Sequence, residues 1–128
     1  MKLNRRAFIG TGAAAATLLS APHVRAAGGG AGKVIVIGGG AGGATAARYL
    51  ARDSKGEIDV TLIEPSRAYY TCFFSNLYIG GFRELSSIGH SYGGLANEGV
   101  NVVHDWAIDV DRAAKTVTLA GGAVLPYD

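Results

Sequence analysis

The only cysteine of this chain, Cys72, lies in an aromatic segment with Tyr69, Tyr70, Phe73 and Phe74 close to it in sequence. Aromatic rings offer flat stacking surfaces and exclude water, and a thiolate is a soft nucleophile. The alternatives are a buried core cysteine, because cysteine is often buried, or one half of a disulfide, which a single cysteine cannot form within its own chain. The residues alone leave these roles open.

A second group of residues has the spacing of a dinucleotide-binding site. Residues 38–43 are GGGAGG, which satisfies G-x-G-x-x-G at Gly38, Gly40 and Gly43 and includes Ala41. The first glycine permits a tight turn, the second lets backbone approach a pyrophosphate, and the third lets a helix lie close to its strand. Because free N–H groups and the dipole at a helix N-terminus favour phosphate, we expect these four residues to bind a cofactor.

An acidic residue follows at a suitable distance. Glu64 lies 21 residues past Gly43 and ends the second of two apolar runs, residues 34–37 and 60–63. Its carboxylate can accept hydrogen bonds from both ribose hydroxyls of an AMP unit and repels a 2′-phosphate, which disfavours NADP. A glycine-rich turn is the alternative, but strand, glycines, helix, strand and acid occur in order within about 30 residues. FAD and NAD both stay open on these residues.

These residues require an α/β fold to position them. The β-branched runs 34–37 and 60–63 are typical of buried parallel strands, residues 44–50 favour a helix between them, and residues 101–104 favour a third strand. We also expect a short helix over residues 85–98, capped by Ser91 and closed by Gly99. The remaining strand signals predict an antiparallel meander, and they fall at residues 106–110, 116–119 and 123–125.

The first 26 residues have the pattern of an export signal. Arg5 and Arg6 belong to a twin-arginine n-region, residues 10–21 are small and uncharged, and residues 24–26 offer small side chains at the positions that a signal peptidase reads. A membrane anchor is the alternative, but a run of about a dozen residues is shorter than the roughly 20 of a spanning helix. We expect a periplasmic protein cleaved after Ala26.

Charge and histidine spacing argue against other classes of function. Of the 12 Lys and Arg, four lie in residues 1–26, leaving eight against ten acidic residues and a net charge of −2. No basic patch then suggests nucleic acid, and we expect no stable membrane insertion. His23, His90 and His104 lack partners at ligand spacing, so we expect no metal site.

The chain from about residue 33 to its end resembles a known family. Residues 34–64, together with "YYTCFFSNLYIGG" and "GVNVVHD", resemble the flavin-binding subunit of flavocytochrome c sulfide dehydrogenase, an exported relative of the glutathione reductase-like flavoproteins. After the expected twin-arginine signal at 1–26 and a flexible leader at 27–32, the resemblance implies at 33–128 the N-terminal part of a Rossmann-like FAD-binding domain. This α/β domain would have a parallel sheet and a β-meander and be incomplete at its C-terminus.

The resemblance also implies roles for two residues. In that family the cysteine of this stretch is joined to the 8α-methyl group of FAD by a thioether, so Cys72 would be a covalent anchor that keeps FAD bound after export. Backbone beyond the third strand meets the adenine in that family, and Ala107 is the candidate here.

The implied function is that of an FAD-dependent oxidoreductase that oxidises sulfide to sulfur and passes electrons to a c-type cytochrome subunit. The redox-active cysteine pair of the family would lie beyond residue 128, so we expect this chain to be inactive alone. No C-x-x-C-H is present, which places any haem on a partner. The alternatives are a sulfide:quinone reductase-like or other pyridine nucleotide-disulfide oxidoreductase-type flavoprotein, or a non-catalytic FAD-binding fragment.

Overall fold

The computed structural model describes residues 32–128, so the predicted signal at 1–26 and most of the leader at 27–32 lie outside the described residues. Gly32, the last leader residue, begins the first strand. The elements follow in the order β1 (Gly32–Ile37), α2 (Ala41–Asp53), β2 (Ile58–Ile63), β3 (Ala68–Tyr70), α3 (Ser75–Ile79), the 3₁₀ helix η1 (Leu85–Ile88), β4 (Gly89–Ser91), α4 (Gly93–Asn97), β5 (Asn101–Val103), β6 (Ala107–Asp111), β7 (Thr116–Leu119) and β8 (Val124–Pro126).

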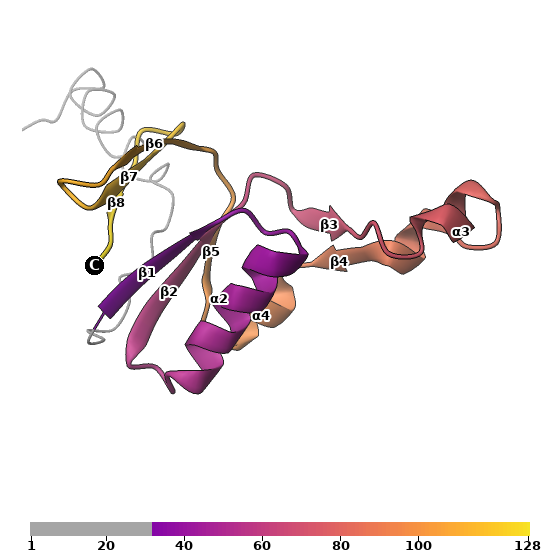
Figure 1. Cartoon of the computed structure of the whole chain (residues 1–128), viewed down its shortest axis with the longest axis horizontal. Helices are drawn as coiled ribbons and strands as arrows, with labels where there is room; N and C mark the ends of the chain where they lie inside the picture. Colours follow the sequence, from indigo (N-terminus) through magenta and orange to yellow (C-terminus); the bar gives the residue numbers. More distant parts are fainter. Residues whose placement is uncertain (1–31) are drawn as a thin grey trace, which may run out of the picture.

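The three apolar runs form a parallel sheet with β2 in its centre, between β1 and β5 (Figure 1). The register pairs Val34 with Val60 and Leu62 with Val102. The first crossover helix, α2, begins three residues before the predicted helix and so includes glycines of the motif. The poor helix propensity of these glycines is overridden by close packing, as described below. The predicted Rossmann-like α/β fold is confirmed.

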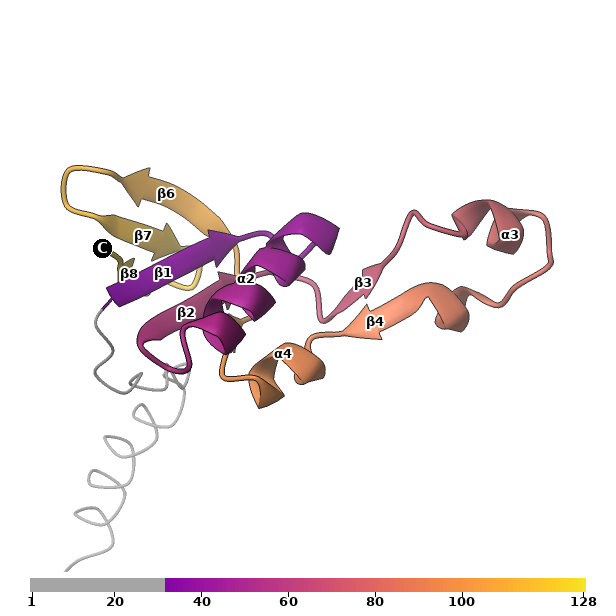
Figure 2. The same ribbon diagram turned by 60° about the horizontal axis from the view of Figure 1, so that its bottom comes forward.

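Two layers of apolar side chains cover the sheet. On one face, α2 and α4 lie against the strands, and the small side chains of Ala47 and Ala51 let α2 approach closely (Figures 1 and 2). On the other face, Ile63 packs against the meander residues Val117, Leu119 and Leu125. Burying apolar surface on both faces is the usual condition of a parallel sheet, and it holds the carboxyl ends of β1, β2 and β5 in fixed positions.

The predicted meander is confirmed as the antiparallel sheet β6-β7-β8. A register shift between Ala107 and Asp109 bends β6. The end of the chain lies beside β1, where the Asp128 backbone N–H donates to the Lys33 carbonyl over 3.0 Å and the Lys33 N–H donates to the Asp128 carboxylate over 2.7 Å. These bonds attach the meander to the edge of the parallel sheet.

The single helix predicted over residues 85–98 is wrong. The structure instead has η1, the strand β4 and the separate short helix α4 in this stretch. β4 pairs antiparallel with β3, so its backbone groups find partners outside any helix, and Ser91 lies in that strand rather than at a cap. The closing glycine is confirmed, because Gly99 follows α4 with a φ of +94°, in the left-handed region.

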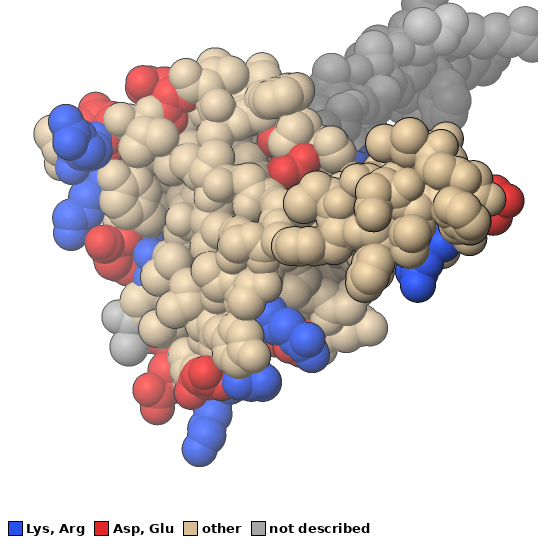
Figure 3. Space-filling view, turned by 45° about the vertical axis from the view of Figure 1, so that its right-hand side comes forward, with Lys and Arg blue, Asp and Glu red and all other residues tan. Residues whose placement is uncertain are grey.

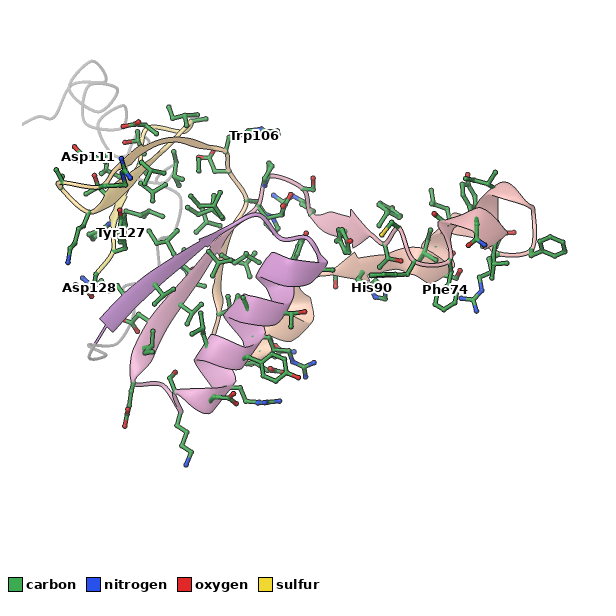
Figure 4. The ribbon with its side chains drawn as sticks, in the orientation of Figure 1. Phe74, His90, Trp106, Asp111, Tyr127 and Asp128 are labelled. Carbon is green, nitrogen blue, oxygen red and sulfur yellow. The ribbon has the colours of Figure 1, made fainter. Side chains whose placement is uncertain are left out.

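Residues 65–91 form an arm that projects from the domain (Figure 2). Its β3-β4 pair leads to α3 and η1, and its side chains include many exposed apolar groups. Phe74 and His90 lie on this arm, remote from the labelled meander residues (Figure 4). The exposed large apolar side chains of the arm are Tyr70, Phe73, Phe74, Tyr78, Ile79, Phe82 and Leu85. No helix within residues 32–128 is both long enough and apolar enough to cross a membrane.

Candidate dinucleotide-binding site

The turn between β1 and α2 requires glycine at three positions. Gly38 has a φ of +98°, which L side chains rarely adopt. A Cβ on Gly39 would lie 2.6 Å from the Tyr92 hydroxyl oxygen, and a Cβ on Gly43 would overlap the Gly38 carbonyl oxygen. Close approach of helix to turn therefore explains why α2 contains glycine in its first turn. We call residues 38–40 the glycine turn.

The N-terminus of α2 is free to receive an anion. Gly40 occupies its N-cap without a side chain to cap the helix, and the first turn contains no acidic residue. First-turn N–H groups have no acceptor in their own helix, and within residues 32–128 neither Gly40 nor Ala41 donates a backbone hydrogen bond to another segment. Within this 13-residue helix, neither a capping side chain nor an acidic residue of the first turn offsets the partial positive charge at its N-terminus.

Glu64 contacts the glycine turn directly. Its two carboxylate oxygens accept hydrogen bonds from the Gly39 N–H over 2.7 Å and from the Ser66 N–H over 2.8 Å. Burial acts to raise the pKa of Glu64, but these hydrogen bonds outweigh burial and hold the pKa below its usual value. Glu64 is therefore ionised at neutral pH and keeps further lone pairs for other donors. The contact with Gly39 was not foreseen from the sequence.

Tyr92 is the functional candidate that sequence reasoning missed. Its side chain is 6% exposed, and its hydroxyl donates a hydrogen bond to the Gly39 carbonyl over 2.9 Å. Burial is the main cause that raises the pKa of this tyrosine, and the charge of Glu64 adds to it. Gly39 and Tyr92 are 53 residues apart, so no local pattern in the sequence could connect them.

His104, which has no partner nearby in the sequence, lies beside Glu64 in the structure. Its Nδ1 atom is 3.0 Å from the Glu64 carbonyl oxygen, and its ring centroid is 6.0 Å from that of Tyr92. Arg67, Tyr92 and His104, with residues of α4 and β5, line a cavity of about 400 Å³. Within residues 32–128, no three His, Cys, Asp or Glu side chains are grouped so that they could hold a metal ion.

Cys72 lies on the arm, in the turn between β3 and α3. Its side chain is exposed, so the alternative of a buried core cysteine is wrong. The Cys72 carbonyl accepts hydrogen bonds from both the backbone N–H and the hydroxyl of Ser75, over 3.2 Å and 2.8 Å. At the base of the arm, Tyr69 lies against the glycine turn, with a ring carbon 3.9 Å from the position of a Cβ on Gly40. The arm thus starts at the glycine turn and carries the thiol outward.

Ala107 begins β6, opposite Leu119, and packs against the second core. The turn before it is fixed by Asp105, whose carboxylate accepts hydrogen bonds from the N–H groups of Trp106 and Gly121 over 2.7 Å and 3.0 Å. Trp106 is exposed at this turn (Figure 4). The structure therefore brings Gly38, Gly40, Ala41, Gly43 and Glu64 together, and places Cys72 and Ala107 on separate elements.

Charged side chains are sparse on the side of the molecule that carries the arm. Figure 3 shows a largely uncharged surface there, with most Lys, Arg, Asp and Glu side chains near its margins and a group of acidic atoms in the upper middle of the view. Two cations lie over aromatic rings, Arg52 over Tyr49 and Arg83 over Phe74. This surface suits aromatic or apolar contacts better than it suits a polyanion.

Comparison with known proteins agrees with this geometry. The family model for pyridine nucleotide-disulphide oxidoreductases matches residues 32–128. The sulfide:quinone oxidoreductase from Aquifex aeolicus is similar in structure, with 28% identity and a TM-score of 0.69 over 77% of this chain and 23% of that one. The NAD-dependent persulfide reductase from A. fulgidus has 29% identity and a TM-score of 0.58 over 75% and 20%.

A third similar structure is the water-forming NADH oxidase from Lactobacillus brevis, with 25% identity and a TM-score of 0.66 over 77% of this chain and 24% of that one. The chain thus spans less than a quarter of the length of each of these three solved structures.

Proposed function

The chain belongs to the pyridine nucleotide-disulphide oxidoreductase family, and from that premise we propose that it is the FAD-binding part of an exported sulfide dehydrogenase. The main observation in support of dinucleotide binding is the uncapped N-terminus of α2. It lies at a turn where side chains are sterically excluded. When bound, FAD would accept an electron pair from the substrate and release electrons to an acceptor.

The described residues fit the AMP half of FAD. The N–H groups of Gly40 and Ala41 are free to bind the diphosphate, and Gly38 and Gly43 let the turn and the helix approach it. Glu64, already ionised and hydrogen-bonded to the turn, is positioned to accept hydrogen bonds from ribose. These residues bind and orient the cofactor, and none of them needs to exchange a proton with substrate.

Cys72 is proposed as the covalent anchor of FAD, through a thioether between its Sγ atom and the 8α carbon. Forming this bond would break the S–H bond of the thiol and one C–H bond of the 8α-methyl group, and the flavin itself would take up the electron pair and the two protons, to be reoxidised by the acceptor. Two observations support this assignment: the thiol is exposed, and it lies on an arm whose base contacts the glycine turn. The exposed aromatic side chains around it are suited to packing against a flat ring system.

The experiment on the anchor uses the complete polypeptide loaded with FAD and then denatured in acid. We expect the yellow colour and the added flavin mass to stay with the protein, and the Cys72→Ser variant to release its FAD into the supernatant. Ser75→Ala is the matched control, since it removes a neighbouring hydroxyl and keeps the thiol. Free FAD released from the wild-type protein would contradict the thioether.

Sulfide is the proposed substrate and a c-type cytochrome subunit the proposed acceptor. The similarity to a sulfide:quinone oxidoreductase and to a persulfide reductase supports reduced sulfur as the substrate class. The first of these also favours a second candidate function, in which a quinone accepts the electrons. Sulfide oxidation by the complete protein, followed with cytochrome c and with a soluble quinone in parallel, separates the two, and faster reduction of the quinone would favour the second.

Export through the twin-arginine pathway into the periplasm is the remaining part of the proposal. It rests on Arg5, Arg6 and the uncharged residues 10–21. In cells that express the protein, we expect a mature chain that begins at Ala27 in the periplasmic fraction. Replacing Arg5 and Arg6 by Lys should keep the precursor in the cytoplasm, and a periplasmic product from that variant would contradict this route.

A further inference from the structure

Tyr92 is a buried side chain to which the proposed function assigns no role. It comes at the start of α4, yet it is bound to the glycine turn through its hydroxyl, which donates to the Gly39 carbonyl over 2.9 Å. The ring itself lies against Gly39, since a Cβ on that glycine would be 2.6–2.7 Å from three atoms of the tyrosine. The contact therefore combines close packing of the ring against Gly39 with a hydrogen bond, which has a preferred direction.

Gly39 is held through both of its polar groups. Its N–H donates to the Glu64 carboxylate over 2.7 Å, and its carbonyl accepts from Tyr92. The two partners come from segments that enter and leave the arm. A residue without a side chain has the widest choice of backbone angles, so these two bonds select one conformation from many.

The bond from Tyr92 has a consequence one residue further along the chain. The Gly39 carbonyl and the Gly40 N–H belong to the same planar trans peptide, in which the C=O and the N–H point in opposite directions. Fixing the carbonyl toward Tyr92 therefore aims the N–H of Gly40, the N-cap residue of α2, away from Tyr92.

We propose that Tyr92 is a positioning residue for the diphosphate of the dinucleotide and acts by orienting the Gly40 N–H toward it. This inference rests on the proposed function, because it assumes that a diphosphate binds at the N-terminus of α2. The hydroxyl remains a donor at neutral pH, since burial and the nearby Glu64 carboxylate both raise the pKa of Tyr92.

The experiment compares two probes, ADP and adenosine, which differ by the diphosphate alone. Binding is followed by NMR titration of the complete polypeptide in a Cys72→Ser background, where FAD binding is expected to be reversible. Loss of one hydrogen bond predicts a three- to tenfold weaker affinity of Tyr92→Phe for FAD and for ADP (about 0.6–1.4 kcal/mol). Its affinity for adenosine should be unchanged. Tyr127→Phe is the matched control, since it removes a hydroxyl from a half-buried tyrosine that packs against the second core, and it should bind all three probes as the parent does.

Each result distinguishes this inference from the proposed function. If the parent protein binds FAD and ADP but Tyr92→Phe binds them equally well, the role of Tyr92 is overturned and the proposed function stands. Equal losses for ADP and adenosine would show a general loosening of the fold and would also overturn that role. Failure of the parent to bind either FAD or ADP would overturn both proposals.

A measurement on the parent protein alone covers the case in which Tyr92→Phe fails to fold. The Gly40 amide resonance should shift on addition of ADP and stay in place on addition of adenosine. A Gly40 amide that does not respond to ADP, while other amides at the start of α2 do, would overturn the inference.

Discussion

At the glycine turn, a residue without a side chain is held by two buried or half-buried partners, whereas along the arm large apolar side chains lie in solvent. Gly39 is bound by Glu64 and Tyr92, while Ile79 and Phe82 are each 82% exposed. Residues 32–128 therefore hold the glycine turn, where we propose that the diphosphate binds, through their own contacts. They leave the apolar surface of the arm uncovered.

The largest change in stability is expected for a variant in the core beneath the glycine turn, and it would test the contrast between the glycine turn and the arm. Leu62 is fully buried in β2, the central strand of the parallel sheet. Leu62→Ala should lower the free energy of unfolding by about 2–5 kcal/mol, because a cavity is left in a close-packed interior. Urea unfolding of the complete polypeptide measures this loss. A change below about 1 kcal/mol would mean that the core beneath the turn relaxes freely.

Two adjacent glycines in α2 provide a matched pair at the turn itself. A Cβ on Gly43 would overlap the Gly38 carbonyl oxygen, whereas a Cβ on Gly42 would meet nothing within 4 Å. Gly43→Ala should weaken FAD binding at least tenfold, which corresponds to about 1.4 kcal/mol, since the turn must shift to admit the methyl group. Gly42→Ala should leave FAD affinity unchanged and raise stability by about 0.5–1 kcal/mol. Fluorescence titration with FAD gives the affinities, and equal effects at the two positions would contradict the steric argument.

Lowering the pH should weaken the hydrogen bond between Glu64 and the glycine turn, because it protonates the carboxylate. The pKa of this carboxyl is lower in the folded chain than its ordinary value of about 4.5. Its ionised form therefore stabilises the fold above that pH, and the contribution is lost as pH falls through the folded pKa. We expect Glu64→Gln to lower stability by about 1 kcal/mol at pH 7 and to lose less stability than the wild type on acidification.

The control for this carboxyl is Glu57→Gln, at the opposite end of β2, which should leave the contribution of Glu64 in place. Urea unfolding at a series of pH values measures both variants. A wild type and a Glu64→Gln variant with identical losses between about pH 6 and pH 3 would show that Glu64 does not stabilise the turn.

The smallest effect is expected on the arm. Phe82→Ala removes a large side chain from a position that is 82% exposed, so the free energy of unfolding of the complete polypeptide without FAD should change by less than about 0.5 kcal/mol. Measured beside Leu62→Ala, this variant sharpens the contrast between the two regions. A loss above about 2 kcal/mol would show that the apolar surface of the arm is already covered by other residues of the protein.

The parts of the fold that could be predicted from sequence are those with local signals. The apolar runs at β1 and β2, the glycine motif, Glu64 and the meander each follow from residue types within short windows. The stretch 85–98 could not be predicted in this way, because the partner that makes Gly89–Ser91 a strand is β3, which lies elsewhere in the chain. The contact between Tyr92 and Gly39 could not be predicted for the same reason, because its two residues are 53 positions apart.

Glu64 and Tyr92 also mark the two ends of the arm, one at its entry and one at its exit. Both are bonded to Gly39, on opposite sides of a single residue. The two ends of the arm are thus held together through one residue, so that moving them apart would have to break a hydrogen bond to Gly39.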